Sequence, residues 1–123
     1  MFENRHYFRG GLCCDLGDQG VHHIDYTSKL FDIDLSGLNR FKAMDKLYNS
    51  LNYKRDFVDL KDGGMKYNLN YSITSHLEIK GKYDLVTNHG TSEHIYNQVT
   101  CFEAIHHLTK KGGLMYHSLN CQG

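Results

Sequence analysis

The sequence lacks the features that most readily assign a chain to a specialised class of protein. No apolar run approaches the roughly 18 residues that a membrane-spanning helix requires. The amino-terminal stretch MFENRHYFRGG has neither an apolar core nor a small-residue cleavage site, so it does not resemble a secretory signal. Together these absences argue against a protein that spans a membrane or is exported.

The cysteines also lack a recognisable pattern. Their spacing contains no CxxC pair, and Cys13 and Cys14 would point to opposite faces of a strand. The full set is Cys13, Cys14, Cys101 and Cys121. A disulfide framework is therefore not expected, and we predict buried, reduced thiols in a cytoplasmic protein.

An excess of charge of either sign is missing too. Fourteen Lys and Arg residues balance 14 Asp and Glu residues, which gives a formal net charge of zero. Proteins that bind nucleic acid through phosphate contacts usually carry a basic excess, so nucleic acid is not an expected partner. The composition, 40% apolar and 23% charged over 123 residues, is typical of one soluble globular domain spanning residues 1–123.

Strand-like and helix-like segments alternate along the chain. Apolar residues three and four positions apart predict one helix over about 37–50 and another around the stripe from Val99 to Leu108, with Asn97 as its cap. Short apolar or alternating runs predict strands over residues 11–16, 56–60, 65–71, 83–87 and 114–119. This order predicts an α/β domain, with three layers around a mainly parallel sheet of about five strands.

Ligands of such sheets bind at the carboxyl ends of the strands, and polar residues follow the first predicted strand here. That segment reads Asp15-Leu16-Gly17-Asp18-Gln19-Gly20. A glycine at this point lets the backbone approach a ligand of nucleotide type, while the same pattern also suits an ordinary tight turn. The segment is neither a GxGxxG fingerprint nor a P-loop.

An acid ends the next predicted strand. Asp59 is placed to accept hydrogen bonds from a ribose diol, as acids at this position do in dinucleotide-binding domains. The alternative is a solvated acid or a turn cap, and Asp62 is a rival for the same role. The residues alone leave these interpretations open.

The stretch YDLVTNHGTSEHI, residues 83–95, carries a buried strand directly into small and polar residues. Glu93, His94 and the nearby His89 are candidates for a general base or for groups that orient a substrate. The alternative is a plain helix start, in which Thr91 or Ser92 caps the helix and Glu93 favours its positive end.

Nine histidines raise the question of a metal site. The adjacent pairs at 22–23 and 106–107 would point apart on a strand or a helix. His89 and His94 are five positions apart, which is not the i, i+4 spacing of a helical zinc site. We therefore expect no metal.

Taken in order, these segments resemble a class I S-adenosylmethionine-dependent methyltransferase, a Rossmann-like family. DLGDQG (15–20) is similar to the family's first motif, a strand ending in an acid-x-Gly turn, and DFVDL (56–60) resembles its second strand with a terminal acid. YDLVTNHGTSEHI and CFEAIHHLTKKGGLMYHSL (101–119) resemble its fourth strand, the following helix and the fifth strand, and the last segment is the most specific. The resemblance covers roughly residues 11–121.

The resemblance implies a place for each part of the cofactor. Asp15 and Gly17 would line the cofactor turn, with Gln19 near the methionine part. Asp59 would hold the ribose hydroxyl groups, and Asn68 on the third predicted strand would reach the adenine. The residues facing the methyl group and the substrate would be Asn88, Gly90 and Thr91.

The resemblance has two departures. The family's first motif usually reads acid-x-Gly-x-Gly-x-Gly, whereas Asp18 and Gln19 interrupt the glycine run here. The family fold also has a helix before the first strand and two strands after the fifth, so by this resemblance the chain corresponds to a fragment or a short relative.

The expected function is therefore methylation of a small-molecule acceptor by S-adenosylmethionine, with His94 as the base or substrate-orienting group and Glu93 as the alternative. The chain contains no proline, so it has no NPPY-like element and gives no support for amino-methylation of adenine or glutamine. A non-catalytic Rossmann-like binding or interaction module, a decayed methyltransferase, is the alternative that the interrupted glycine run favours. A nicotinamide-dependent oxidoreductase shares the sheet and the strand-end acid, but its GxGxxG fingerprint is missing.

Overall fold

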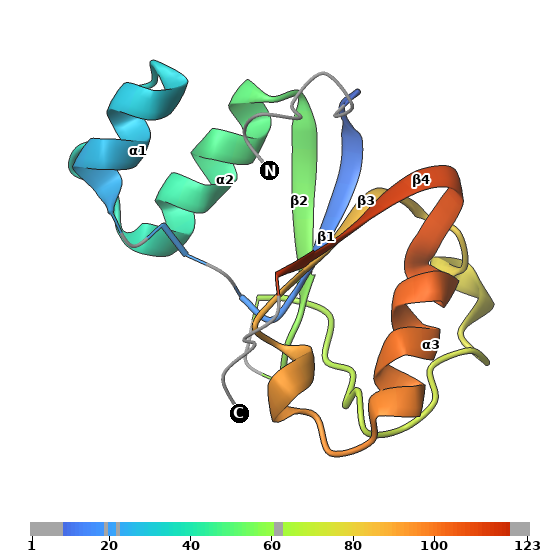
Figure 1. Cartoon of the computed structure of the whole chain (residues 1–123). Coiled ribbons are helices and arrows are strands. Elements are labelled where there is room, and N and C mark those ends of the chain that lie inside the picture. The colour runs from blue at the N-terminus through green and yellow to red at the C-terminus, as the bar shows by residue number, and fades with distance from the viewer. Residues whose placement is uncertain (1–8, 19, 22, 61–62, 119–123) are drawn as a thin grey trace.

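The computed structural model describes residues 9–18, 20–21, 23–60 and 63–118 (Figure 1). These residues form four strands in one parallel sheet, in the order β2-β1-β3-β4. In chain order the strands are β1 (Gly11–Leu16), β2 (Tyr53–Val58), β3 (Tyr83–His89) and β4 (Thr109–Ser118). The α/β class and the parallel sheet expected from the sequence are confirmed.

Helical segments connect the strands. Among the described residues the α-helices are α1 (Ile24–Phe31), α2 (Arg40–Ser50) and α3 (Gln98–Leu108), and the 3-10 helices are η2 (Leu77–Ile79) and η3 (Ser92–His94). Asparagine side chains cap two of the α-helices: Asn39 accepts two amides of α2, and Asn97 accepts the amide of Thr100 in α3, as predicted. These caps satisfy amides that helix geometry leaves without partners.

The face of the sheet beneath α3 is closed by apolar packing. β1 contributes Cys14 and Leu16, and α3 contributes Ile105 and Leu108. Further members, from β2, β3, α3 and the connection between β2 and β3, are Val58, Leu69, Ile73, Ile79, Tyr83, Val86, Cys101 and Ala104. Removal of this apolar surface from water is the main force that holds α3 on the sheet.

The opposite face is covered by α2 over β1 and β2, and α1 lies against α2 (Figure 1). A smaller cluster here joins Tyr48 of α2 to Cys13, Tyr53 and Leu85 of the strands. Cys13 and Cys14 fall in different clusters because successive residues of a strand point to opposite faces. None of the residues of α1 is buried.

One predicted strand is absent from the described part of the chain. Residues 65–71 form no strand, so the sheet has four strands and not about five, and a single bridge joins Met65 to Val58. The alternating pattern arises because Leu69 is buried beneath α3 and Tyr67 packs against the same cluster, while Asn68 is exposed. A connection that buries every second side chain produces the sequence pattern of a strand without a sheet partner.

Two other strands begin earlier than predicted. β2 begins at Tyr53 instead of residue 56, because the polar Arg55 obscured an apolar pattern. β4 begins at Thr109 instead of residue 114, because a register shift opposite Tyr83 and Leu85 takes the glycine-containing segment 110–113 into the strand. Both extensions lie at the amino-terminal ends of the strands. At the carboxyl ends, β2 stops at Val58 instead of residue 60, and β3 continues to His89 instead of residue 87.

The connections of the sheet diverge between β1 and β3. The chain passes from β1 through α1 and α2 to β2 on one side, and from β3 through α3 to β4 on the other. These helices lie on opposite faces (Figure 1). Open α/β sheets bind ligands outside the carboxyl ends of the strands at such a switch point, so a ligand site is expected at the ends of β1 and β3.

The described cysteines, Cys13, Cys14 and Cys101, are buried and unbridged as predicted, and Cys121 lies outside the described residues. Burial raises the pKa of all three thiols, so they stay protonated at neutral pH. None of the helices in the described ranges combines the length and the apolar content that crossing a membrane requires.

Candidate functional site

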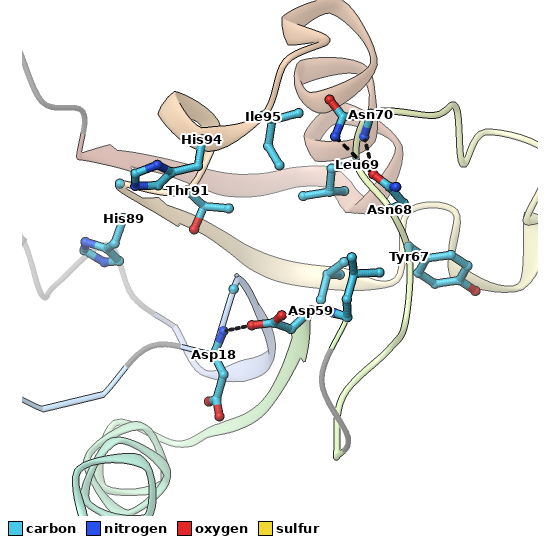
Figure 2. A pocket seen from close by; sticks show the side chains of 14 residues that line it. Asp18, Asp59, Tyr67, Asn68, Leu69, Asn70, His89, Thr91, His94 and Ile95 are labelled. Atoms are coloured by element: carbon cyan, nitrogen blue, oxygen red, sulfur yellow. Dashed lines mark hydrogen bonds between the residues drawn. The ribbon is translucent and has the colours of Figure 1, made fainter. Parts of the chain in front are cut away.

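A pocket of about 530 Å³ lies at the carboxyl ends of β1, β2 and β3, where the connections of the sheet diverge (Figure 2). Its lining comes from the segments around residues 17–18, 58–60, 67–70 and 89–95. The structure thereby brings together several residues singled out from the sequence, namely Gly17, Asp59, Asn68, Gly90, Thr91 and His94. Their proximity is a property of the fold, whereas their chemical roles stay predictions.

The turn after β1 requires a glycine. Gly17 has a φ of +76°, in the left-handed region where a side chain is strained. Its amide donates to the carbonyl of Val58 over 2.8 Å, which ties the end of β1 to the end of β2. The following residue, Asp18, directs its amide to Asp59 and its carboxylate to Arg55. Gly17 is the glycine at which the backbone of this turn borders the pocket.

Asp59 follows the last residue of β2, as a ribose-binding acid would. Its Oδ2 accepts the amide of Asp18 over 3.1 Å, and its Oδ1 accepts the amide of Leu60 over 2.7 Å. A carboxylate has about four acceptor sites, spread over its two oxygens. Asp62, the rival acid, lies outside the described residues.

The turn after β3 is fastened to the neighbouring strands. The hydroxyl of Thr91 donates to the carbonyl of Leu16 over 2.6 Å, and the amide of Gly90 donates to the carbonyl of Ser118 over 2.9 Å. Gly90 has a φ of +65°. Thr91 precedes η3, but its own side chain makes no capping hydrogen bond, so its hydroxyl bonds the end of β1 and not the helix.

His89 and His94 both border the pocket, but their environments differ. His89 is half-buried with its ring centroid 4.9 Å from that of Tyr116, and burial lowers its pKa, which keeps the imidazole neutral at neutral pH. The side chain of His94 is 79% exposed, and its Nε2 lies 3.6 Å from Oε1 of Glu93. Glu93 is not among the residues that line the pocket.

The connection between β2 and β3 forms the wall of the pocket that lies across from the histidines (Figure 2). Oδ1 of Asn68 accepts the amide of Asn70 over 3.0 Å and its Nδ2 over 3.2 Å. Asn70 in turn accepts the amide of Asn97, at the start of α3, over 2.9 Å. Leu69 is buried between them, so this wall offers both amide and apolar groups.

Asn88 and Asp15 were predicted to touch the cofactor but do not line the pocket. Asn88 is fully buried, where its Nδ2 donates to Oγ of Ser92 and its Oδ1 accepts the amide of Ser92, so it shapes the turn from within. Gln19 lies outside the described residues. Asp15 is also fully buried, because its side chain points from the sheet face toward α2 and not along the strand toward the pocket.

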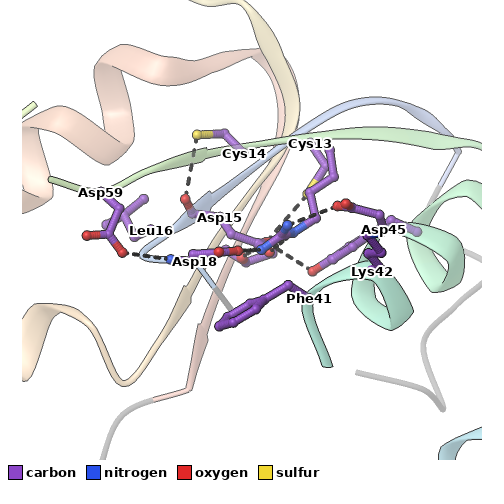
Figure 3. A network of polar contacts seen from close by, with 12 residues as sticks. Cys13, Cys14, Asp15, Leu16, Asp18, Phe41, Lys42, Asp45 and Asp59 are labelled. Carbon is purple, nitrogen blue, oxygen red and sulfur yellow. Dashed lines mark hydrogen bonds and ion pairs between the residues drawn. The ribbon is translucent and has the colours of Figure 1, made fainter. Parts of the chain in front are cut away.

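Asp15 belongs to a buried polar network beneath the turn (Figure 3). Its Oδ1 accepts the hydroxyls of Tyr48 and Thr87, and its Oδ2 lies 2.6 Å from Nε of Arg55. Burial alone would lower the pKa of Arg55, but the charge of Asp15 and the hydrogen bonds to carboxylates outweigh it and raise that pKa. Arg55 therefore stays charged inside the protein.

Sequence reasoning missed Arg55, Tyr67 and Asn70 as residues of the site and its support. A signal for Arg55 existed, because an acid in the middle of an apolar strand, such as Asp15, requires a buried partner. The sequence does not say which of its 14 basic residues supplies that partner. Tyr67 and Asn70 were hidden because their segment resembled a strand.

The described lining of the pocket contains Asp18 and Asp59 but neither lysine nor arginine. Arg55 pairs with Asp18 from behind, at 2.8 Å, but it shares its single positive charge with Asp15 and Asp45, so both Asp18 and Asp59 make this side of the pocket acidic. No group of three or more potential metal-ligating side chains gathers anywhere in the described ranges.

Comparison of the chain with protein-family models, with curated proteins and with solved structures finds no match.

Proposed function

We propose that this chain binds S-adenosylmethionine and transfers its methyl group to a small-molecule acceptor. The observation that carries the proposal is the meeting of Asp59 with the Gly17 turn and the Gly90-Thr91 turn in one pocket at the switch point of the sheet. In sheets of this kind, a glycine turn after the first strand admits a ligand close to the backbone, and an acid ending the second accepts ribose hydroxyl groups. The Rossmann-like sequence resemblance supports the same function.

The lining residues fit the parts of a nucleoside cofactor. Asp59 offers carboxylate oxygens to a ribose diol. Leu60, Leu69 and Ile95 offer apolar surface to a purine, and the amide of Asn68 offers a polar contact at its edge. The volume of about 530 Å³ lies within the range of small-molecule sites.

The charge of the pocket favours this cofactor over a phosphate-bearing one. Phosphate groups are usually held by arginine, lysine or clustered backbone amides, and no described residue of the lining is a lysine or an arginine. The sulfonium of S-adenosylmethionine is cationic, so the carboxylate of Asp59 attracts it. A nicotinamide dinucleotide would instead bring a pyrophosphate to the turn after β1, where Asp18 lines the pocket and the described lining holds neither lysine nor arginine.

When bound, S-adenosylmethionine supplies a methyl group that its sulfonium already activates, so the protein mainly aligns acceptor and donor. The compact turn at Gly90 and Thr91 leaves room for the reacting groups beside the strand ends. We assign His94 as the base or orienting group, with Glu93, 3.6 Å from its Nε2, as the alternative. His89 is a further candidate, because its neutral imidazole is able to accept a proton.

Calorimetric titration with S-adenosylhomocysteine tests the binding step. Asp59→Asn keeps the shape of the side chain but removes its charge, so we expect the affinity to fall about 10- to 100-fold, as for loss of a hydrogen bond to a charged group. Asp25→Asn is the matched control, because it removes the same charge from an exposed position in the first turn of α1. Equal affinity of the two variants, or no binding by the wild-type protein at millimolar ligand, would contradict the proposal.

Binding without catalysis is the second candidate function, and the exposure of His94 favours it. A side chain that is 79% exposed, with only Glu93 as an ion-pair partner among the described residues, is weakly oriented for proton transfer. His94→Ala in a protein that turns over tests its role: we expect turnover to fall about 10²- to 10⁴-fold with cofactor affinity unchanged. A protein that binds S-adenosylhomocysteine but methylates no acceptor would support the binding module.

A further inference from the structure

Arg55 connects three separate segments through its guanidinium. It reaches Asp15 of β1 at 2.6 Å, Asp18 of the following turn at 2.8 Å and Asp45 of α2 at 3.0 Å. Its side chain is only 2% exposed, and the carboxylates of Asp15 and Asp18 are 0% and 7% exposed. Charge-assisted contacts in such shielded surroundings hold their partners in one geometry.

Asp18 transmits this constraint to the pocket. Its carboxylate accepts from Nη2 of Arg55, and its backbone amide donates to Oδ2 of Asp59 over 3.1 Å. The side chain and the amide of one residue thus point in different directions, one toward the interior and one toward the acid of the pocket. A carboxylate held by Arg55 restricts the rotation of the backbone at residue 18, and with it the direction of this amide.

Within the described residues, Asp18 links this turn to the acid of the pocket. A run of glycines would let the backbone wrap a ligand closely, but Asp18 interrupts that run directly after Gly17. The amide of Gly17 is bonded to Val58, inside β2, and not to Asp59. The amide of Asp18 donates directly to the carboxylate of Asp59.

We propose that Arg55 is the positioning residue of the candidate site: by holding the carboxylate of Asp18, it aims the Asp18 amide at Asp59 and fixes the acid that meets ribose hydroxyl groups. The statement about ribose rests on the proposed function, whereas the coupling of Arg55, Asp18 and Asp59 rests on the contacts alone. An ion pair thereby takes over the role that glycines have in a more open turn.

The test removes the partners of Arg55 one at a time, because removing Arg55 itself leaves Asp15 buried without its cation. Asp18→Ala breaks the coupling, and Asp45→Ala removes the same charge from the same guanidinium at a position outside the pocket. Asp18→Asn keeps an acceptor oxygen for Arg55 and serves as the conservative rescue.

The first readout needs no ligand. Hydrogen exchange of the backbone amide of residue 18 is expected to rise about tenfold in Asp18→Ala, as loss of one hydrogen bond implies, and to stay within about twofold of wild type in Asp45→Ala. Asp18→Asn is expected to retain most of the protection. Equal exchange rates in the two alanine variants would overturn the proposal, because the network would then hold the turn without passing through Asp18.

The second readout measures the affinities for adenosine and 2′-deoxyadenosine. Wild type and Asp45→Ala are expected to prefer adenosine about tenfold, and Asp18→Ala is expected to lose that preference. An unchanged preference in Asp18→Ala would overturn the positioning of Asp59. If no variant and no wild-type protein binds either nucleoside, the proposed function fails, and the exchange rates still decide the coupling.

Discussion

Beneath α3 the sheet packs against leucine, isoleucine, valine and alanine side chains, whereas beneath α2 it holds a buried arginine with its carboxylates. The two faces belong to the same four strands, and residues that are neighbours in β1 contribute to different faces. Cys14 and Leu16 enter the apolar cluster, while Asp15 enters the polar network. The apolar face tolerates motion of individual side chains, whereas the polar face requires every partner to be in place.

This difference explains why the candidate site sits beside the polar face. Directional contacts between Arg55 and the residues after β1 define the position of a turn more narrowly than apolar packing does. Asp59 lies at the other end of the same network. The apolar face supplies the stability that lets the polar face carry buried charges.

The largest effect is expected from Arg55→Met. The substitution fills a similar space but leaves Asp15 charged and fully buried, so the free energy of unfolding is expected to fall by about 3–5 kcal/mol. Urea denaturation measures it. Adding Asp15→Asn removes the unpaired charge and should recover part of the loss. If the free energy of unfolding of Arg55→Met alone lies within about 1 kcal/mol of the wild-type value, well below the expected loss, the polar face contributes little to stability.

On the apolar face, Ile105→Ala is expected to lower the free energy of unfolding by about 3 kcal/mol, through lost burial and a residual cavity. Val99→Ala is the control on the same helix: Val99 is 68% exposed, so its truncation should change stability by less than about 0.5 kcal/mol. Equal losses in the two variants, again from denaturant midpoints, would contradict the assignment of the core to this face of α3.

Tyr83→Phe removes one polar contact from the border of the apolar face. The hydroxyl donates to Oδ2 of Asp56 over 2.8 Å, but the carboxylate of Asp56 is 37% exposed, so water replaces the lost donor. The expected loss is about 1 kcal/mol, well below that for Arg55→Met. Thermal unfolding of Tyr83→Phe and Arg55→Met under the same conditions measures the difference in stability. An equal loss in the two variants would mean that the burial of the carboxylate that loses its donor has no effect on the cost.

The smallest effect is expected from the titration of His89. Burial lowers its pKa in the folded state, so the unfolded chain takes up this proton more readily. The contribution of neutral His89 is therefore complete above the unfolded pKa, near 6.5, and is lost as the pH falls through the folded pKa. The free energy of unfolding is measured at pH 7.5 and 5.5, roughly one unit on each side of that value. His89→Phe, which keeps a ring beside Tyr116, should lose less of it between these pH values than wild type does. An identical loss in the two proteins would show that His89 does not contribute to the pH dependence.

The sequence predicted those strands and helices whose residues follow one regular pattern of apolar and polar side chains. The strand from Gly11 and the strand from Tyr83 are largely buried on both faces, as central parallel strands are. The helix capped by Asn97 combines a cap with an apolar stripe. No prediction covered α1, which has no buried residue and therefore leaves no strong pattern.

The site was predictable in its position but not in its support. The polar residues after each strand indicated where a pocket would form, because parallel strands end at the same edge. That Asp15 would turn away from this pocket depends on Arg55 and Thr87, residues 40 and 72 positions further along the chain. A pairing over such distances leaves no local signal, so the buried partner of an acid cannot be read from its neighbours.

The bond between Thr91 and Leu16 spans 75 positions of the chain and closes the pocket between β1 and β3. During synthesis, β1 and the turn at Gly17 therefore leave the ribosome long before Thr91, which completes this side of the pocket. Contacts of such separation form late and slow the folding of a domain, since a long loop must close before they are gained. Ligand binding to this pocket would consequently report completed folding, and a ligand added during refolding would stabilise the native protein without accelerating its earliest steps.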